Sequence, residues 1–153
     1  MKNIRTLTPL KSKEVKKIFK QIDEQFNIGK IELDYYFFIS RKNRVYIISR
    51  GLGENDLLNL RLSHSGLYFC TIEKDGIRMS IEGSQLIGKY AKKNVITIDD
   101  DHRDLWITGS DLHLSEDELG YVLIKNKTDF YGCGRNVGDK ILTYIPKSRR
   151  VFI

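Results

Sequence analysis

The stretch GYVLIKNKTDFYGCGRNVGDKILTYIPKSRRVFI, residues 120–153, decides how the C-terminal part of the chain folds. Its apolar, β-prone runs at 121–124, 130–135 and 141–145 predict three strands, and Pro146 ends the third. The turns between the runs are short. We therefore expect a small barrel or meander in this part of the chain.

The same stretch carries an excess of positive charge. Asp129 and Asp139 are its only acidic residues, and they face a set of cations made of Lys125, Lys127, Arg135, Lys140, Lys147, Arg149 and Arg150. A compact β surface with this charge bias suits a polyanion.

The whole chain has 153 residues, of which 41% are hydrophobic and 30% charged. This length allows one ordinary domain or two small ones that share an interface. The apolar runs are too short to span a bilayer, and the N-terminus lacks the apolar core of a signal peptide. We therefore expect no membrane association and a cytoplasmic location.

The formal net charge of +6 favours a partner with many phosphates, because long-range attraction raises the local concentration of such a partner. The charge is unevenly distributed. Cations gather at 11–20, at 41–50 and after residue 125, whereas acidic residues crowd the middle, namely Asp99, Asp100, Asp101, Asp104, Asp111, Glu116, Asp117 and Glu118. The protein is therefore expected to be electrostatically two-sided.

Residues 1–92 combine helix and strand patterns. Apolar residues at helical spacing predict a helix that begins at an N-cap on Ser12 and extends to Phe26. Two hairpins are expected, one from 33–40 and 44–49, the other from 67–72 and 77–81. Ser84 is expected to cap a brief helix after the second hairpin.

A new strand is expected at 95–98, and we place a domain boundary just before it. The predicted fold class is α+β, with an N-terminal α/β domain at 1–92 that has a mixed or antiparallel sheet and a C-terminal β domain at 93–153. Within the second domain, after the strand at 95–98, residues 99–106 are expected to form a helical turn that directs Leu105, Trp106 and Ile107 inward. A tight turn should follow at 109–112.

Three segments carry a resemblance to a known family: VITIDDDHRDLWITGSDLHL at 95–114, GYVLIKN at 120–126 and DFYGCGR at 129–135. Together with the basic C-terminus they resemble the PUA domain, a small RNA-binding pseudobarrel. The first half, with DYYFFIS at 34–40 and NRVYIIS at 43–49, resembles the α/β domain that precedes PUA in small ribosome-biogenesis proteins.

The resemblance points to archaeal relatives of the large-subunit assembly factor and to the tails of Sun-type RNA cytosine methyltransferases. It implies a C-terminal pseudobarrel and a stand-alone RNA-binding factor without catalytic activity. Ribosomal or transfer RNA is the expected ligand, with ribosome-assembly or RNA-modification proteins as further partners. The sequence has no GxGxxG motif after a strand, so no cofactor is expected.

RNA recognition needs cations for phosphates, accessible backbone amides and flat side chains on which bases stack. Gly109 and Ser110 match the helix-to-strand turn of PUA relatives, where RNA backbone approaches main-chain amides. Tyr131 and Tyr144 are candidate stacking residues that also suit the core. The candidate phosphate contacts are Arg135, Lys147, Arg149 and Arg150, followed by Lys125 and Lys127. Without the resemblance, a merely solvated basic surface explains these cations equally well.

A metal-dependent RNA-processing enzyme is the first alternative. Carboxylates and imidazoles are dense at Asp99, Asp100, Asp101, His102, Asp104, Asp111 and His113, and such groups can hold a divalent cation. The spacing matches neither an Asp-x-Asp-x-Asp-Gly loop nor HExxH, and an acidic helix start explains the run more simply.

The second alternative is a protein-interaction adaptor that uses the acidic middle or the basic N-terminal helix.

Cys70 and Cys133 lie in apolar settings without CxxC spacing. We expect both to be buried, reduced thiols.

Overall fold

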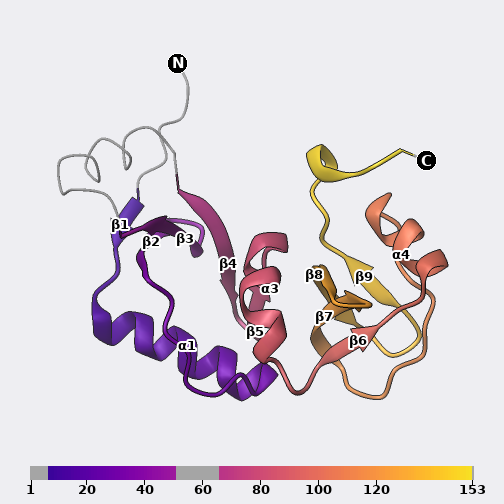
Figure 1. Ribbon diagram of the computed structural model, residues 1–153, viewed down its shortest axis with the longest axis horizontal. Helices are drawn as coiled ribbons and strands as arrows, with labels where there is room; N and C mark the ends of the chain where they lie inside the picture. The colour runs from indigo at the N-terminus through magenta and orange to yellow at the C-terminus, as the bar shows by residue number, and fades with distance from the viewer. Residues whose placement is uncertain (1–6, 51–65, 153) are drawn as a thin grey trace.

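The computed structural model describes residues 7–50 and 66–152, and in them the chain is an α+β protein with two sheets (Figure 1). The first sheet is antiparallel, with its five strands in sequence order. These strands are β1 (Leu7–Pro9), β2 (Tyr35–Ser40), β3 (Arg44–Ser49), β4 (Leu67–Glu73) and β5 (Gly76–Met79). Both predicted hairpins are confirmed, and Asn43 adopts a φ of 60° in the turn of the first.

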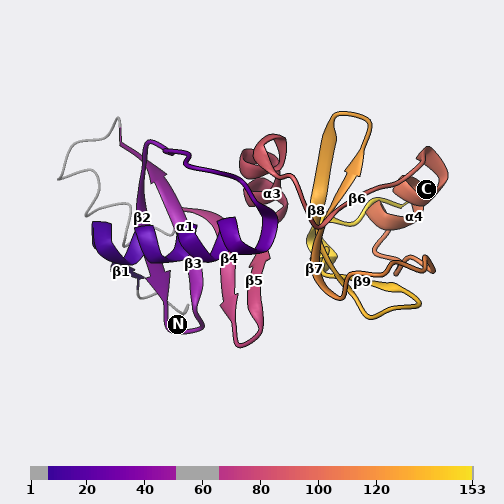
Figure 2. The same cartoon turned by 90° about the horizontal axis from the view of Figure 1, so that it is seen from below.

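Helix α1 (Ser12–Phe26) crosses one face of this sheet (Figure 2). The helix buries three of its own side chains, Ile18, Ile22 and Phe26, as their helical spacing predicts. Ser12 is the first helical residue rather than the N-cap. The preceding backbone N–H of Lys11 instead donates to Glu14 Oε1 at 3.0 Å.

Helix α3 (Ile81–Ile87), continued by the 3₁₀ turn η1 (Gly88–Tyr90), lies between the two sheets. The prediction that Ser84 caps it was wrong, because Ser80 is the N-cap and its hydroxyl accepts from the backbone of Gly83 at 2.8 Å. Ser84 is fully buried within the helix. Its hydroxyl accepts a hydrogen bond from the backbone of Gly132 at 3.0 Å, which joins α3 to the second sheet.

The second sheet has the strand order β6-β7-β8-β9. Its strands are β6 (Val95–Thr97), β7 (Gly120–Asn126), β8 (Asp129–Asn136) and β9 (Ile141–Thr143). β6 is parallel to β7, and the other pairs are antiparallel, so the sheet is mixed. A bridge between Leu112 and Ile141 extends the β9 side, and within the described residues the sheet is not a closed barrel.

Helix α4 (Asp100–Ile107) lies in the connection between β6 and β7. Trp106 is fully buried in a core with Ile96, Ile124 and Ile141, and its indole N–H donates to the backbone oxygen of Tyr131 at 2.7 Å. Trp106 therefore points inward as predicted. Leu105 does not, because it is 51% exposed on the outer side of the helix.

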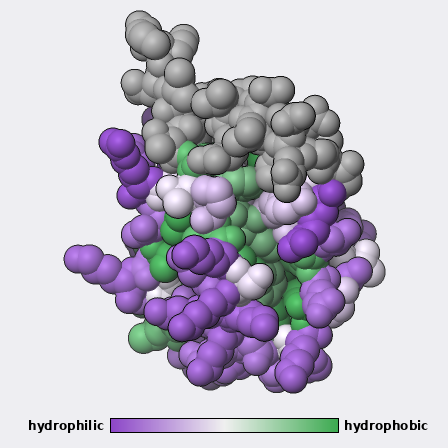
Figure 3. All heavy atoms as spheres, turned by 90° about the vertical axis from the view of Figure 1, so that its left-hand side faces the viewer, coloured by the Kyte–Doolittle hydropathy of each residue, from purple (hydrophilic) through white to green (hydrophobic). Residues whose placement is uncertain are grey.

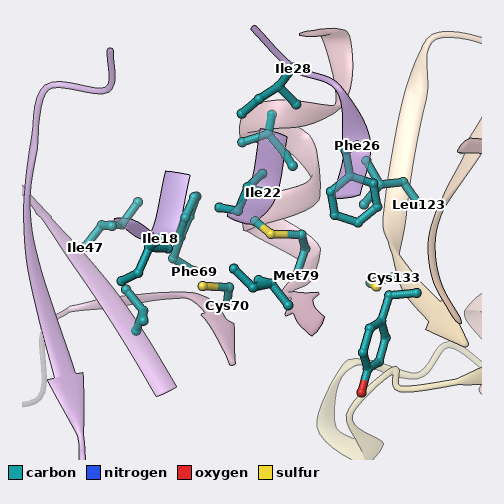
Figure 4. Close-up of a cluster of buried hydrophobic side chains, with 14 of the residues drawn as sticks. Ile18, Ile22, Phe26, Ile28, Ile47, Phe69, Cys70, Met79, Leu123 and Cys133 are labelled. Atoms are coloured by element: carbon teal, nitrogen blue, oxygen red, sulfur yellow. The ribbon is translucent and has the colours of Figure 1, made fainter. Parts of the chain in front are cut away.

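Besides the core around Trp106, a larger hydrophobic core is shared by the two sheets. Leu123, Phe130 and Cys133 of the β7–β8 hairpin pack in the same cluster as residues of α1 and the first sheet, among them Phe26 and Met79 (Figure 4). Cys70 and Cys133 are both buried free thiols in this core, as predicted. Burial raises the pKa of Cys133 to about 12, so this thiol is protonated at neutral pH.

Among the helices of residues 7–50 and 66–152, none combines the length and apolar character needed to cross a membrane.

Gly83 offers a test of this packing. A Cβ atom at residue 83 would lie 2.1 Å from the backbone oxygen of Phe69, whereas helix propensity alone would favour alanine by about 1 kcal/mol. We expect Gly83→Ala to lower the free energy of unfolding by about 1–3 kcal/mol, because the overpacked backbone must shift. Urea unfolding measures this change. Gln21→Ala on the exposed side of α1 serves as the control, and stabilisation by Gly83→Ala would contradict the packing.

Candidate nucleic-acid interface

The C-terminal segment, residues 145–152, lies against the end of helix α4. The backbone N–H of Val151 donates to the oxygen of Ile107 at 2.8 Å. Before this contact the chain forms the 3₁₀ turn η2 (Lys147–Arg149), in which the N–H of Arg149 donates to the oxygen of Pro146 at 2.9 Å. Figure 1 shows this segment running from η2 toward α4. Two regions that are far apart in sequence thus form one surface.

Gly109 also lies in the contact between them. It adopts a φ of 90°, which favours glycine, and the backbone N–H groups of Gly109 and Ser110 donate to Trp106 and Leu105 at the helix end. The Arg150 side chain lies directly over it, since a Cβ atom at residue 109 would be 2.3 Å from Arg150 Nε. That Nε also donates to the Ile145 oxygen at 3.2 Å.

Five predicted site residues belong to these two regions: Gly109 and Ser110 at the end of α4, and Lys147, Arg149 and Arg150 in the C-terminal segment, of which Arg150 contacts Gly109. Lys147 and Arg149 are exposed on η2, and Arg149 forms an ion pair with Glu82 of α3 at 2.7 Å. The Arg149 guanidinium holds the pKa of Glu82 below its ordinary value. We call this group, together with Phe152, the C-terminal basic surface.

Phe152 is a member that the sequence interpretation missed. Its side chain is 97% exposed next to Val151. A flat, accessible aromatic ring beside cations is the arrangement on which unpaired bases stack. The signal in the sequence was an aromatic residue two positions after the Arg149-Arg150 pair.

Lys125, Lys127 and Tyr131 lie elsewhere, on the β7–β8 hairpin. Lys125 Nζ stands 5.6 Å from the centre of the Phe130 ring, and Lys127 in the turn is 3.6 Å from Asp100. Tyr131 is half-buried against the core around Trp106. Lys127 adjoins the N-terminal end of α4, whereas the C-terminal basic surface adjoins its other end.

Arg135 and Tyr144 face the N-terminal half of the protein. Arg135 forms an ion pair with Asp75 of the β4–β5 turn at 2.5 Å and donates to the Tyr121 hydroxyl at 3.2 Å. The Arg78 guanidinium lies 4.4 Å from the centre of the Tyr144 ring. Both predicted RNA contacts are therefore engaged in the junction between the two sheets.

The acidic residues at the start of α4 have structural partners. Asp99 caps the helix, since its carboxylate accepts from the His102 backbone at 2.8 Å. Asp100 accepts from Asn126 Nδ2 at 3.1 Å, and Asp111 accepts from the Thr143 backbone at 2.8 Å. In the described ranges no three His, Cys, Asp or Glu side chains gather as a metal site would require.

A separate apolar hollow of about 710 Å³ lies between α1 and strand β2. Phe19, Ile31, Leu33 and Tyr35 contribute to its lining, and Arg50 stands at its edge. Figure 3 faces this end of the molecule and shows hydrophobic residues surrounded by hydrophilic ones. None of the predicted RNA contacts lines it.

The Asp75–Arg135 pair predicts a pH dependence of stability. The Arg135 hydrogen bond holds the pKa of Asp75 below its ordinary 3.8, so the stability it adds is complete above that value and is lost as the pH falls through the lower folded value. We expect Asp75→Asn to be less stable than the parent protein at pH 7, and the difference to shrink as the pH falls below 3.8.

Urea unfolding across this pH range measures the difference, and Asp117→Asn in the exposed loop before β7 is the control. A constant difference between Asp75→Asn and the parent at every pH would contradict this role of the carboxylate.

Comparison with known proteins gives a distant similarity. No family model matches the chain. Over 107 residues it is 27% identical to proteins named ribosomal RNA small subunit methyltransferase F from two strains of Vibrio vulnificus, YJ016 and CMCP6. The match covers 70% of this chain but 22% of the length of each relative. The chain is therefore similar to a limited part of a protein named as an RNA methyltransferase, in partial agreement with the resemblance found in the sequence.

Proposed function

We propose that this protein is a non-catalytic RNA-binding factor that contacts structured ribosomal or transfer RNA in ribosome biogenesis or RNA modification. The C-terminal basic surface is its main contact with the RNA. No cofactor takes part in this function, and the protein works in the cytoplasm.

The observation that carries the proposal is the packing of the Arg150 side chain over Gly109, with Lys147 and Arg149 exposed on the adjoining turn η2. The cations supply charge for phosphates, which position a nucleic acid, and Phe152 supplies a flat surface for a base. The backbone hydrogen bond from Val151 to Ile107 holds residues 145–152 against α4.

The Vibrio relatives support an RNA ligand, because their name assigns them an activity on ribosomal RNA. The portion shared with this chain is a small part of their length, which suits a module that binds RNA. We propose that this module works alongside RNA-modification or ribosome-assembly proteins.

We further propose that residues 93–153 form a PUA-like domain. The mixed sheet β6–β9, the bridge from Leu112 to Ile141 and the core around Trp106 support a pseudobarrel in which α4 closes one side. Residues 1–92 then form the preceding α/β domain.

Salt dependence tests the proposal directly. If the three cations of the C-terminal basic surface neutralise phosphates, the affinity for a structured RNA should fall by roughly 20- to 40-fold between 50 and 200 mM salt, and by about a thousandfold if six or more cations of the protein take part. Lys147→Gln should weaken binding and lower the slope of log affinity against log salt by about 0.7–0.9. Fluorescence anisotropy with a labelled RNA hairpin measures both quantities.

Lys30→Gln, an exposed cation between α1 and β2, is the matched control. Binding that hardly changes with salt would overturn the proposal. Metal-dependent cleavage of the hairpin by pure protein, stopped by a chelator, would overturn its non-catalytic part and favour the acidic region as an active site.

Phe152 gives a second test of the same surface. Stacking of a base on an aromatic side chain contributes about 1–3 kcal/mol, so Phe152→Ala should weaken binding to a single-stranded RNA by roughly five- to 150-fold. Phe152→Trp should retain the affinity because it keeps a flat ring. Equal affinities of the alanine variant and the parent would exclude Phe152 from the interface.

A further inference from the structure

A cavity of about 300 Å³ lies in the junction between the two halves of the protein. Its walls come from β4, β5 and the start of α3 on one side, and from β8 and the C-terminal segment on the other. Tyr68, Arg78 and Glu82 line the first side; Tyr144, Pro146 and Arg149 line the second. The cavity thus exists only because the two halves are packed together.

One wall is a stacked pair of flat groups. The Arg78 guanidinium lies 4.4 Å from the centre of the Tyr144 ring, and its Nε is buried without a hydrogen-bond acceptor in the described structure. That Nε forms an ion pair with Glu73 Oε2 at 3.5 Å. Glu73 and the Tyr144 ring thus hold Arg78 in place, and its guanidinium forms a flat part of the wall.

The mouth of the cavity holds a second guanidinium. Arg149 is paired with Glu82 at 2.7 Å, and their side chains are 47% and 25% exposed. A pair this accessible to solvent contributes little to stability and can be exchanged for a stronger partner. A phosphate offers Arg149 a bidentate acceptor with more charge than the carboxylate.

The cavity is also continuous with the C-terminal basic surface. Arg149 and Ser148 line it, while their neighbours Lys147 and Arg150 belong to the surface that closes on Gly109. An RNA strand that follows this surface therefore passes the mouth of the cavity.

We propose that the junction cavity receives one unpaired nucleotide of the bound RNA. Its phosphate replaces Glu82 as the partner of Arg149, and its base lies against the apolar and aromatic wall that contains Tyr144. The volume is at the small end of ligand sites, which suits one nucleotide and excludes a duplex. This inference rests on the proposed RNA-binding function and names the part of the RNA that the junction recognises.

The Glu82–Arg149 pair makes the proposal testable, because its two members should act in opposite directions. Arg149→Gln removes the phosphate contact and should weaken binding of an RNA hairpin with an unpaired loop by about tenfold. Glu82→Gln releases Arg149 from its competitor and should strengthen binding by roughly two- to fivefold. If the pair is only a structural bridge, neither change alters affinity beyond its effect on folding.

A steric variant tests the cavity independently of charge. Ser148→Trp places a large side chain at the lining and should weaken hairpin binding by about tenfold, whereas Ser115→Trp, in the exposed loop before β7, should not. Neither tryptophan variant should alter binding of a fully paired duplex of equal length, which has no nucleotide to insert.

The experiment uses the full chain and fluorescence anisotropy at one salt concentration, at a temperature where thermal unfolding shows each variant folded. Absence of hairpin and duplex binding by the parent protein would remove the proposed function, and this inference with it. Parent binding with unchanged affinities in both Glu82→Gln and Ser148→Trp would overturn the cavity site alone. Weakening by Glu82→Gln as large as that by Arg149→Gln would also overturn it.

Discussion

Burial of the β7–β8 hairpin against the N-terminal half is the contact on which the rest of the structure depends. Leu123, Phe130 and Cys133 fill a core that also contains Phe26 of α1 and Met79 of β5. Each sheet has an apolar face that it cannot bury alone, and α3 seals the space between them. Close approach at α3 is possible because Gly83 and Gly88 present no side chain to Phe69 and Phe130. The relative position of the two halves is therefore a property of packing.

Arginine side chains reinforce this junction at its exposed border. Arg135 reaches Asp75, and Arg149 reaches Glu82, so two cations of the C-terminal half bind carboxylates of the N-terminal half. The two differ in function under our proposal. Arg135 also contacts the ring and hydroxyl of Tyr121, so it is held within the junction between the two halves. Arg149 lines a cavity, where an anion can compete with Glu82 for its guanidinium.

Much of the local fold could be predicted because hairpins, turns and helices depend on residues that are close together in the sequence. Runs of β-prone, apolar residues predicted the hairpins, and residues that tolerate positive φ, such as Asn43, marked their turns. The choice between Ser80 and Ser84 as helix cap could not be predicted in this way, since both are serines with helical residues after them. Contacts from β8 decided it: Ser84 is needed inside the helix to hold the backbone of Gly132.

The candidate site was predictable in composition and only partly in arrangement. The turn at Gly109 and the cations after Pro146 were found from sequence and meet in space. Arg135 and Tyr144 were predicted to lie on the surface. A cation or an aromatic residue at a strand end gives the same sequence pattern whether its side chain faces water or the other half of the protein. Only long-range packing separates these cases.

The burial of Trp106 has a spectroscopic consequence. It is the only tryptophan of the chain, and it lies in the smaller core of the C-terminal sheet rather than in the core that both halves share. Its indole is fixed by the Tyr131 backbone and shielded from water. Intrinsic fluorescence excited at the indole band therefore observes the C-terminal half selectively, whereas the eight tyrosines, spread over both halves, observe the whole chain. Comparing tryptophan and tyrosine fluorescence during unfolding shows whether the two halves separate from each other before they unfold.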